Sequence, residues 1–179
     1  AVLYIPRSRL KVGGPASFMR LLEERIRARK LRVTRNRFAS ADNALIPISM
    51  DSECLKQWKS KDDSRKVFQR LDGVFYDPQK SDFDPVRNEQ LKIIYHELAD
   101  VHIFQSQYSR SQCIHFLGHP KRRVDESIVI NGTDLNLFAP ADQQKLDPQH
   151  VRFITTGNFR DPEMLLPILE SLDQLKATY

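Results

Sequence analysis

Two stretches decide the predicted fold: Val101-His102-Ile103-Phe104-Gln105-Ser106-Gln107-Tyr108-Ser109-Arg110 and Ser127-Ile128-Val129-Ile130-Asn131-Gly132-Thr133-Asp134-Leu135-Asn136-Leu137-Phe138. Each contains a run of β-favouring apolar residues that stops at polar turn residues, which is the pattern of a buried parallel strand. Ligands bind beside the carboxyl ends of strands in open α/β sheets. The polar residues after each run are therefore candidates for a binding site.

Strand and helix patterns alternate along the chain. Apolar runs predict strands at Val2–Ile5, Leu31–Val33, Ala44–Ile48, Lys66–Leu71, Val101–Phe104 and Ile128–Ile130. Helical spacing predicts helices that bury Phe18, Leu21, Leu22 and Ile26, then Leu91, Ile94, Tyr95 and Leu98, then Cys113, Phe116 and Leu117. The alternation predicts an α/β fold, a Rossmann-like open parallel sheet with helices on both faces.

Turn and cap signals set the expected boundaries. Ser109 is predicted to cap the helix that stops at Gly118, and the prolines of residues 76–87 predict a loop. Val151–Thr155 should form another strand. A last helix should begin at Pro162 with Asp161 as its cap, and Pro167 would be strained in it unless that helix starts late.

Composition narrows the class of protein. The 179 residues are 40% hydrophobic, enough for a core, and no apolar run approaches the ~20 residues of a membrane span. Two cysteines, Cys54 and Cys113, show no metal-ligand spacing, and the five histidines offer no third ligand, so no metal site is expected. A reduced, cytoplasmic protein is the simplest expectation.

The net charge of +5 is concentrated in one segment. Eight cationic residues lie between Arg20 and Arg37. They are either a solvated helix face with its exit loop, or a surface that attracts phospholipid heads, a lipid diphosphate or nucleic acid. Phe38 is the only aromatic residue nearby, which disfavours base stacking and hence nucleic acid. A protein held peripherally at an anionic membrane is one prediction of this pattern.

Two further motifs could carry chemistry. Gly13-Gly14 follows the first predicted strand and opens the first helix, where backbone N–H groups suit an anion such as a diphosphate. Arg70 and Asp72 end another strand at the same expected edge and share one face of it. They are either an ion pair that shapes the loop or part of a binding site.

Together these motifs resemble GT-B glycosyltransferases of the family-4 type. The matching stretches are Lys11-Val12-Gly13-Gly14, Gln69–Tyr76, Gln105–Ser109 and Asn131–Asp134. The resemblance implies a nucleotide-sugar donor, a polysaccharide or lipid-linked acceptor, and no cofactor or metal. It places Lys11, Gly13 and Gly14 at the donor phosphates and acceptor; Arg70, Asp72, Gln105, Ser106 and Tyr108 on the acceptor side; Asn131, Gly132 and Asp134 at the cleft turn; and Gly157 and Arg160 on the donor side of a second domain.

The resemblance also implies a domain plan. Residues 1–138 would form the acceptor-binding domain, 139–150 a linker, and 151–179 the start of a second domain. The family's acidic donor-binding region has no counterpart in these residues, and Asn158 stands where the family carries a basic residue. The prediction is thus the N-terminal part of a glycosyltransferase, inactive alone and with unassigned catalytic residues. The alternatives are a non-enzymatic Rossmann-like binding module and a basic nucleic-acid-binding domain.

Overall fold

The computed structural model describes residues 1–6, 14–74, 84–130, 132 and 165–178. The chain divides into two compact units, Ala1–Thr133 and Asp134–Tyr179. The predicted linker 139–150 and the predicted strand Val151–Thr155 lie outside the described residues.

The first unit is built on one open sheet of six parallel strands in the order β2-β1-β3-β4-β5-β6. This confirms the predicted fold class. The strands are β1 (Val2–Tyr4), β2 (Arg32–Thr34), β3 (Asn43–Pro47), β4 (Lys66–Leu71), β5 (Val101–Phe104) and β6 (Asp125–Ile128).

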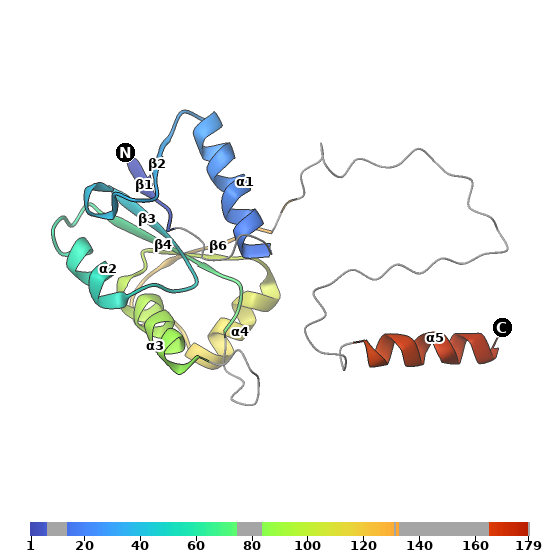
Figure 1. Ribbon diagram of the computed structural model, residues 1–179. Coiled ribbons are helices and arrows are strands. Elements are labelled where there is room, and N and C mark those ends of the chain that lie inside the picture. Colours follow the sequence, from blue (N-terminus) through green and yellow to red (C-terminus); the bar gives the residue numbers. More distant parts are fainter. Residues whose placement is uncertain (7–13, 75–83, 131, 133–164, 179) are drawn as a thin grey trace. The chain divides into compact units, whose positions relative to one another are not determined.

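Helices cover both faces of the sheet (Figure 1). Helix α1 (Gly14–Ala28) packs Met19 against Ile5 and Leu45 on one face. The opposite face carries α2 (Ser52–Lys59), α3 (Pro85–Ile93), its continuation η2 (Ile94–Leu98), and α4 (Gln107–Leu117). A short helix, η1 (Phe38–Ser40), precedes β3. Successive side chains of a strand point to opposite faces, so Phe68 faces α1 whereas Val67 and Leu71 face the other helices.

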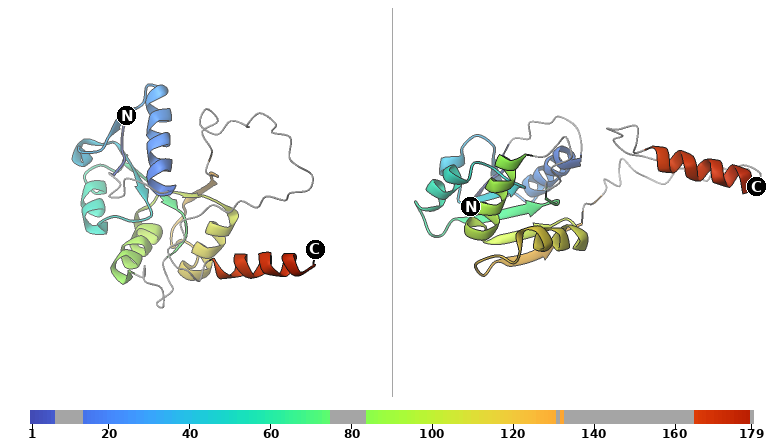
Figure 2. Two further views of the ribbon diagram at one scale, coloured as in Figure 1. Left: turned by 45° about the vertical axis from the view of Figure 1, so that its right-hand side comes forward. Right: turned by 90° about the horizontal axis from the view of Figure 1, so that it is seen from below.

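Strand β6 differs from its prediction in both position and burial. It spans Asp125–Ile128 instead of Ile128–Ile130, and all four of its residues are exposed. Its register explains the shift, because Val101 pairs with Asp125 and Phe104 with Ile128, which uses the whole length of β5. Figure 2 shows β6 in orange at the outer edge of the sheet, where no further strand of the described residues pairs with it.

The start and one face of α4 also differ from prediction. Ser106, not Ser109, is the N-cap, and Ser109 is its partner in a capping box: each hydroxyl accepts from the other's backbone N–H, at 3.0 and 3.1 Å. Cys113 and Leu117 are buried as predicted, but Phe116 is 46% exposed because it lies on the solvent side of the helix. The helix does end at Gly118, whose φ of +78° suits glycine.

Helix α2 was not predicted, and α3, which carries the predicted Leu91, begins earlier than expected. Helix α2 is capped by Asp51, which accepts from the backbone N–H of Cys54 at 2.8 Å, and it buries Leu55 and Trp58. Helix α3 begins at Pro85 with Asp84 as its cap, so the last residues of the predicted 76–87 loop are helical. Pro85 in the first turn is compatible with a helix because its missing N–H would have no intrahelical partner.

The second unit contributes helix α5 (Leu166–Thr178) to the described residues. It begins later than the predicted start at Pro162, and Asp161 lies outside the described residues. Pro167 is therefore in the first turn, where proline is tolerated. Leu166, Leu169 and Leu175 are exposed on this helix.

Candidate functional site

Three of the predicted acceptor-side residues meet just past the carboxyl ends of β4 and β5. The Arg70 guanidinium forms an ion pair with Asp72, and its Nη2 donates to Oε1 of Gln105 at 3.4 Å. Nε2 of Gln105 donates to the backbone carbonyl of Asp72 at 3.1 Å. We call Arg70, Asp72 and Gln105 the carboxyl-edge cluster. Arg70 and Asp72 therefore form the predicted ion pair, and the pair lies at the edge of the sheet where a ligand would bind. An ion pair that shapes the loop and a part of a binding site are both compatible with this placement.

The amino-terminal part of α1 packs against this cluster. The guanidinium carbon of Arg70 lies 3.9 Å from the centroid of the Phe18 ring, a cation–π contact. Phe18 is one helical turn after Gly14, the residue at which α1 begins. The contact therefore places the positive end of the α1 dipole on the same side of the sheet as the carboxyl-edge cluster.

The strand order reverses at the same edge. The chain passes from β1 to β2 on one side and then returns to β3 on the other side of β1. Such a switch point is where open α/β sheets bind ligands. Ile48, directly after β3, has a φ of +68°, which is a strained conformation for a β-branched residue. Its backbone is held by the carbonyl of Arg70 at 2.8 Å and by Nε2 of Gln69 at 2.8 Å.

Arg70 and Asp72 differ in their access to solvent. Arg70 is only 2% exposed, whereas the Asp72 side chain is 21% exposed. Burial raises the pKa of Asp72, and the positive charges of Arg70 and Arg87 counteract part of that rise. Among the described residues, Oδ2 of Asp72 accepts no hydrogen bond. That oxygen could accept hydrogen bonds from sugar hydroxyl groups.

Two further predicted acceptor-side residues lie at the start of α4. The Ser106 hydroxyl is used in the capping box, which gives it a structural role. Tyr108 is 72% exposed and is a candidate for contact with a ligand or partner. The remaining candidates are mostly outside the described residues: Lys11, Gly13, Asn131, Asp134, Gly157 and Arg160. Gly132 is described and exposed, outside any helix or strand.

Sequence reasoning missed Phe18 and Ile48 as parts of this edge. Phe18 was assigned only to the core face of α1, and nothing in its helical spacing shows that it ends under Arg70. The sequence pattern predicts Ile48 only as the end of a strand. A Pro-Ile-Ser sequence after an apolar run gives no signal for positive φ, since that conformation is imposed by the backbone contacts of β4.

The histidines form no metal site among the described residues, where no group of three or more metal-ligating side chains occurs. His102 is fully buried and stacks on Tyr95 with 4.3 Å between the ring centroids. Burial lowers the pKa of His102 to about 4. It is thus a neutral core residue at pH 7.

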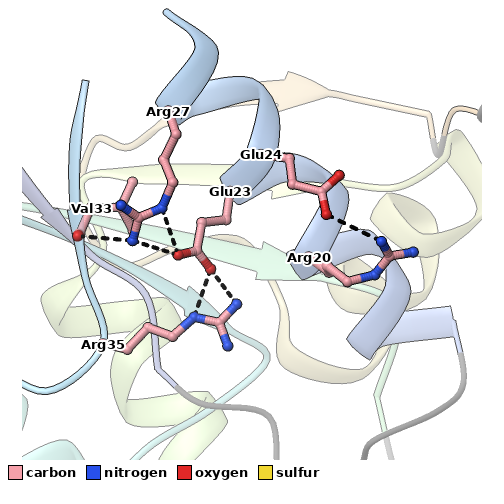
Figure 3. Close-up of polar contacts among 6 residues, drawn as sticks. All are labelled: Arg20, Glu23, Glu24, Arg27, Val33 and Arg35. Carbon is pink, nitrogen blue, oxygen red and sulfur yellow. Dashed lines mark hydrogen bonds and ion pairs between the residues drawn. The ribbon is translucent and has the colours of Figure 1, made fainter. Parts of the chain in front are cut away.

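The basic segment contains one organised cluster, drawn in Figure 3. Glu23, on α1, accepts two hydrogen bonds from Arg27, at 2.7 and 2.9 Å, and one from Nε of Arg35 at 2.6 Å. Burial by itself would raise the pKa of Glu23, but the hydrogen bonds from Arg27 and Arg35 lower it overall. Arg20 pairs separately with Glu24 at 3.1 Å. Part of the basic segment is therefore neutralised within the fold.

No protein-family model matches the chain, and neither a curated protein nor a solved structure matches it significantly. Among the helices of the described residues, none is both long enough and apolar enough to cross a bilayer. What is established is thus an α/β unit with a Rossmann-like parallel sheet and a polar cluster at its carboxyl edge.

Proposed function

We propose that the chain is the N-terminal, acceptor-binding part of a nucleotide-sugar-dependent glycosyltransferase. The observation that carries this proposal is the placement of Arg70, Asp72 and Gln105 beside the amino-terminal turns of α1, through the Arg70–Phe18 contact. These residues come from two motifs that the resemblance assigned to the acceptor side. They lie at the edge where open α/β sheets bind ligands.

The chemistry of the cluster fits a hydroxylated acceptor. Arg70 is too buried to approach a ligand and acts as the support of Asp72. The Asp72 carboxylate and the Gln105 amide then present acceptor and donor groups that match sugar hydroxyls. The anionic donor would lie at the amino-terminal end of α1, because a helix N-terminus favours negative charge.

Sugar transfer by the native protein that contains this chain tests the proposal. The protein would be incubated with UDP-, GDP- and ADP-linked sugars and with lipid-linked or oligosaccharide acceptors, and products would be followed by mass spectrometry. Acceptor-dependent consumption of one nucleotide sugar is expected. A native protein that binds and consumes none of them would contradict the proposal.

Kinetic variants sharpen the assignment. Asp72→Asn should raise the acceptor KM by about tenfold, the cost of a lost charged hydrogen bond, and leave the donor KM nearly unchanged. Lys61→Gln, at an exposed position away from the cluster, is the matched control. An equal effect on donor and acceptor KM would argue against an acceptor-side role.

A further inference from the structure

A second candidate site lies near the amino ends of the strands. An apolar pocket of about 360 Å³ is lined by residues of α1 and of five strands, among them Leu22, Leu45, Phe68 and Ile103. This volume is within the range of about 300–1,000 Å³ that is typical of ligand sites. Ala1, which precedes β1, and Asn43, the first residue of β3, also line it, so it is distinct from the carboxyl-edge cluster.

A cationic pocket adjoins the apolar one. Its volume is about 550 Å³, and its lining includes Arg27, Lys30, Arg32 and Arg37 but no acidic and no aromatic residue. Leu31 and Arg32 line both pockets, so the two are adjacent. Arg27 is paired with Glu23, whereas Lys30, Arg32 and Arg37 make no side-chain ion pair among the described residues. The composite site is apolar at one end and positively charged at the other.

The end of α1 forms the junction between the pockets. Leu31 N–H donates to the carbonyl of Ile26 at 3.3 Å and Lys30 N–H to that of Arg27 at 2.8 Å, which is the Schellman pattern. Lys30 has a φ of 62°, a conformation in which glycine is usual. The chain thus carries a cation at a position where the backbone alone would favour glycine, and that cation lines the cationic pocket.

We propose that this composite site binds a single-chain anionic lipid, with its hydrocarbon chain in the apolar pocket and its phosphate or carboxylate head in the cationic pocket. The apolar lining supplies burial for a chain, and the unpaired cations supply charge complementarity for a head group. Nucleic acid fits less well, since the cationic pocket has no aromatic side chain for base stacking. The proposal does not rest on the proposed glycosyltransferase function.

The test is calorimetric titration of the full chain with hexyl, octyl and decyl phosphate below their critical micelle concentrations. Binding should tighten about fourfold for each added methylene until the pocket is filled. Inorganic phosphate, which has the charge without the chain, and 1,2-octanediol, which has the chain without the charge, should each bind at least tenfold more weakly than octyl phosphate.

Variants separate the site from general stability. Lys30→Gly should raise the melting temperature, because it relieves the positive φ, and yet weaken octyl phosphate binding about fivefold. Arg32→Gln should also weaken it about fivefold, whereas Lys61→Gln should leave it unchanged. Ile103→Trp should block the apolar pocket; Val86→Trp, at an exposed position on α3, is its control.

Four outcomes would overturn the proposal. They are an affinity independent of chain length, equal binding of inorganic phosphate or of 1,2-octanediol, unchanged binding in Lys30→Gly and Arg32→Gln, and displacement of decyl phosphate by a short single-stranded oligonucleotide that binds more tightly. Tightening with chain length, together with selective weakening in Lys30→Gly, would support it.

Discussion

Two polar clusters lie at opposite edges of the same sheet, and they differ in how completely their carboxylates are used. At the amino edge, Asp100 accepts from Lys59 at 2.6 Å, from Arg122 at 2.7 Å and from the backbone N–H of Val67 at 2.8 Å. We call Lys59, Asp100 and Arg122 the amino-edge cluster. At the carboxyl edge, Asp72 has Arg70 as its hydrogen-bond donor, and its second oxygen accepts no bond among the described residues.

The pKa values of the two aspartates move in opposite directions. Burial would raise the pKa of Asp100, but hydrogen bonds from Lys59, Val67 and Arg122 lower it overall. For Asp72, burial prevails and the pKa is raised. A lowered pKa means that the charged carboxylate stabilises the fold, and a raised one means that the fold disfavours the charge. The charge of Asp100 thus stabilises the fold, whereas the charge of Asp72 does not.

The largest expected difference between the two clusters is the loss of stability when each aspartate is replaced by asparagine. Asp100→Asn should lower the free energy of unfolding by about 3 kcal/mol, because Lys59 and Arg122 lose their common partner. Asp72→Asn should lower it by about 1 kcal/mol or less, since the amide can still accept from Arg70. Urea unfolding at pH 7 measures both. Equal losses in the two variants would contradict the assignment of different roles.

His102, in the buried centre of β5 between the two edges, should make the stability of the fold depend on pH. The pKa of His102 is about 4 in the fold, against about 6.5 in the unfolded chain. The unfolded state therefore binds the extra proton as the pH falls from 6.5 towards 4, and stability falls with it. The loss between pH 7 and pH 5 should be about 2 kcal/mol. His102→Phe, which keeps an aromatic ring against Tyr95, should abolish this loss; a wild-type stability that is flat over this range would contradict the assignment.

Replacing Glu23 should cost less stability than replacing Asp100 does, since the cations that pair with Glu23 are half exposed. Glu23→Gln should lower the free energy of unfolding by about 1 to 2 kcal/mol, because Arg27 and Arg35 lose a shared carboxylate. Glu24→Gln, which breaks only the exposed pair with Arg20, should cost less than about 0.5 kcal/mol. Thermal unfolding of the two variants in parallel tests this, and an inverted order would show that Glu23 does not organise the segment.

The smallest expected effect is a gain in the free energy of unfolding. Lys30→Gly should stabilise the fold by about 0.5 to 1 kcal/mol, because glycine adopts the positive φ at the end of α1 without strain. Lys30→Ala, which removes the charge but keeps the strain, is the control and should give no such gain. A loss of stability in Lys30→Gly would show that the lysine side chain contributes contacts that outweigh the strain.

The centre of the sheet could be predicted from the sequence, and its periphery could not. Strands β4 and β5 have the predicted bounds because their apolar runs are flanked by charged or turn residues on both sides. Strand β6 was placed too late, since the apolar residues Ile128, Val129 and Ile130 attracted the assignment although they are exposed. At an edge, pairing with the neighbouring strand decides the position, and apolar periodicity does not.

The candidate site was predictable only in part, for a similar reason. The motif residues Arg70, Asp72 and Gln105 were singled out, and the parallel strand ends bring them together. The cation–π contact with Phe18 and the strain at Ile48 depend on residues distant in the chain, and no local pattern encodes them. No local pattern encodes the amino-edge cluster either, because its three side chains come from α2, from the turn before β5 and from the segment before β6.

An NMR titration of the ¹⁵N-labelled chain with nucleotide sugars and soluble oligosaccharides tests most directly whether the carboxyl edge is the binding site. We expect the largest amide shifts at Asp72, Gly73 and Gln105 and near Gly14, and we expect Asp72→Asn to raise the oligosaccharide concentration needed for half-maximal shifts about tenfold. Shifts confined to the amino edge around Lys59, Asp100 and Arg122, or no shift with any of these ligands, would contradict it.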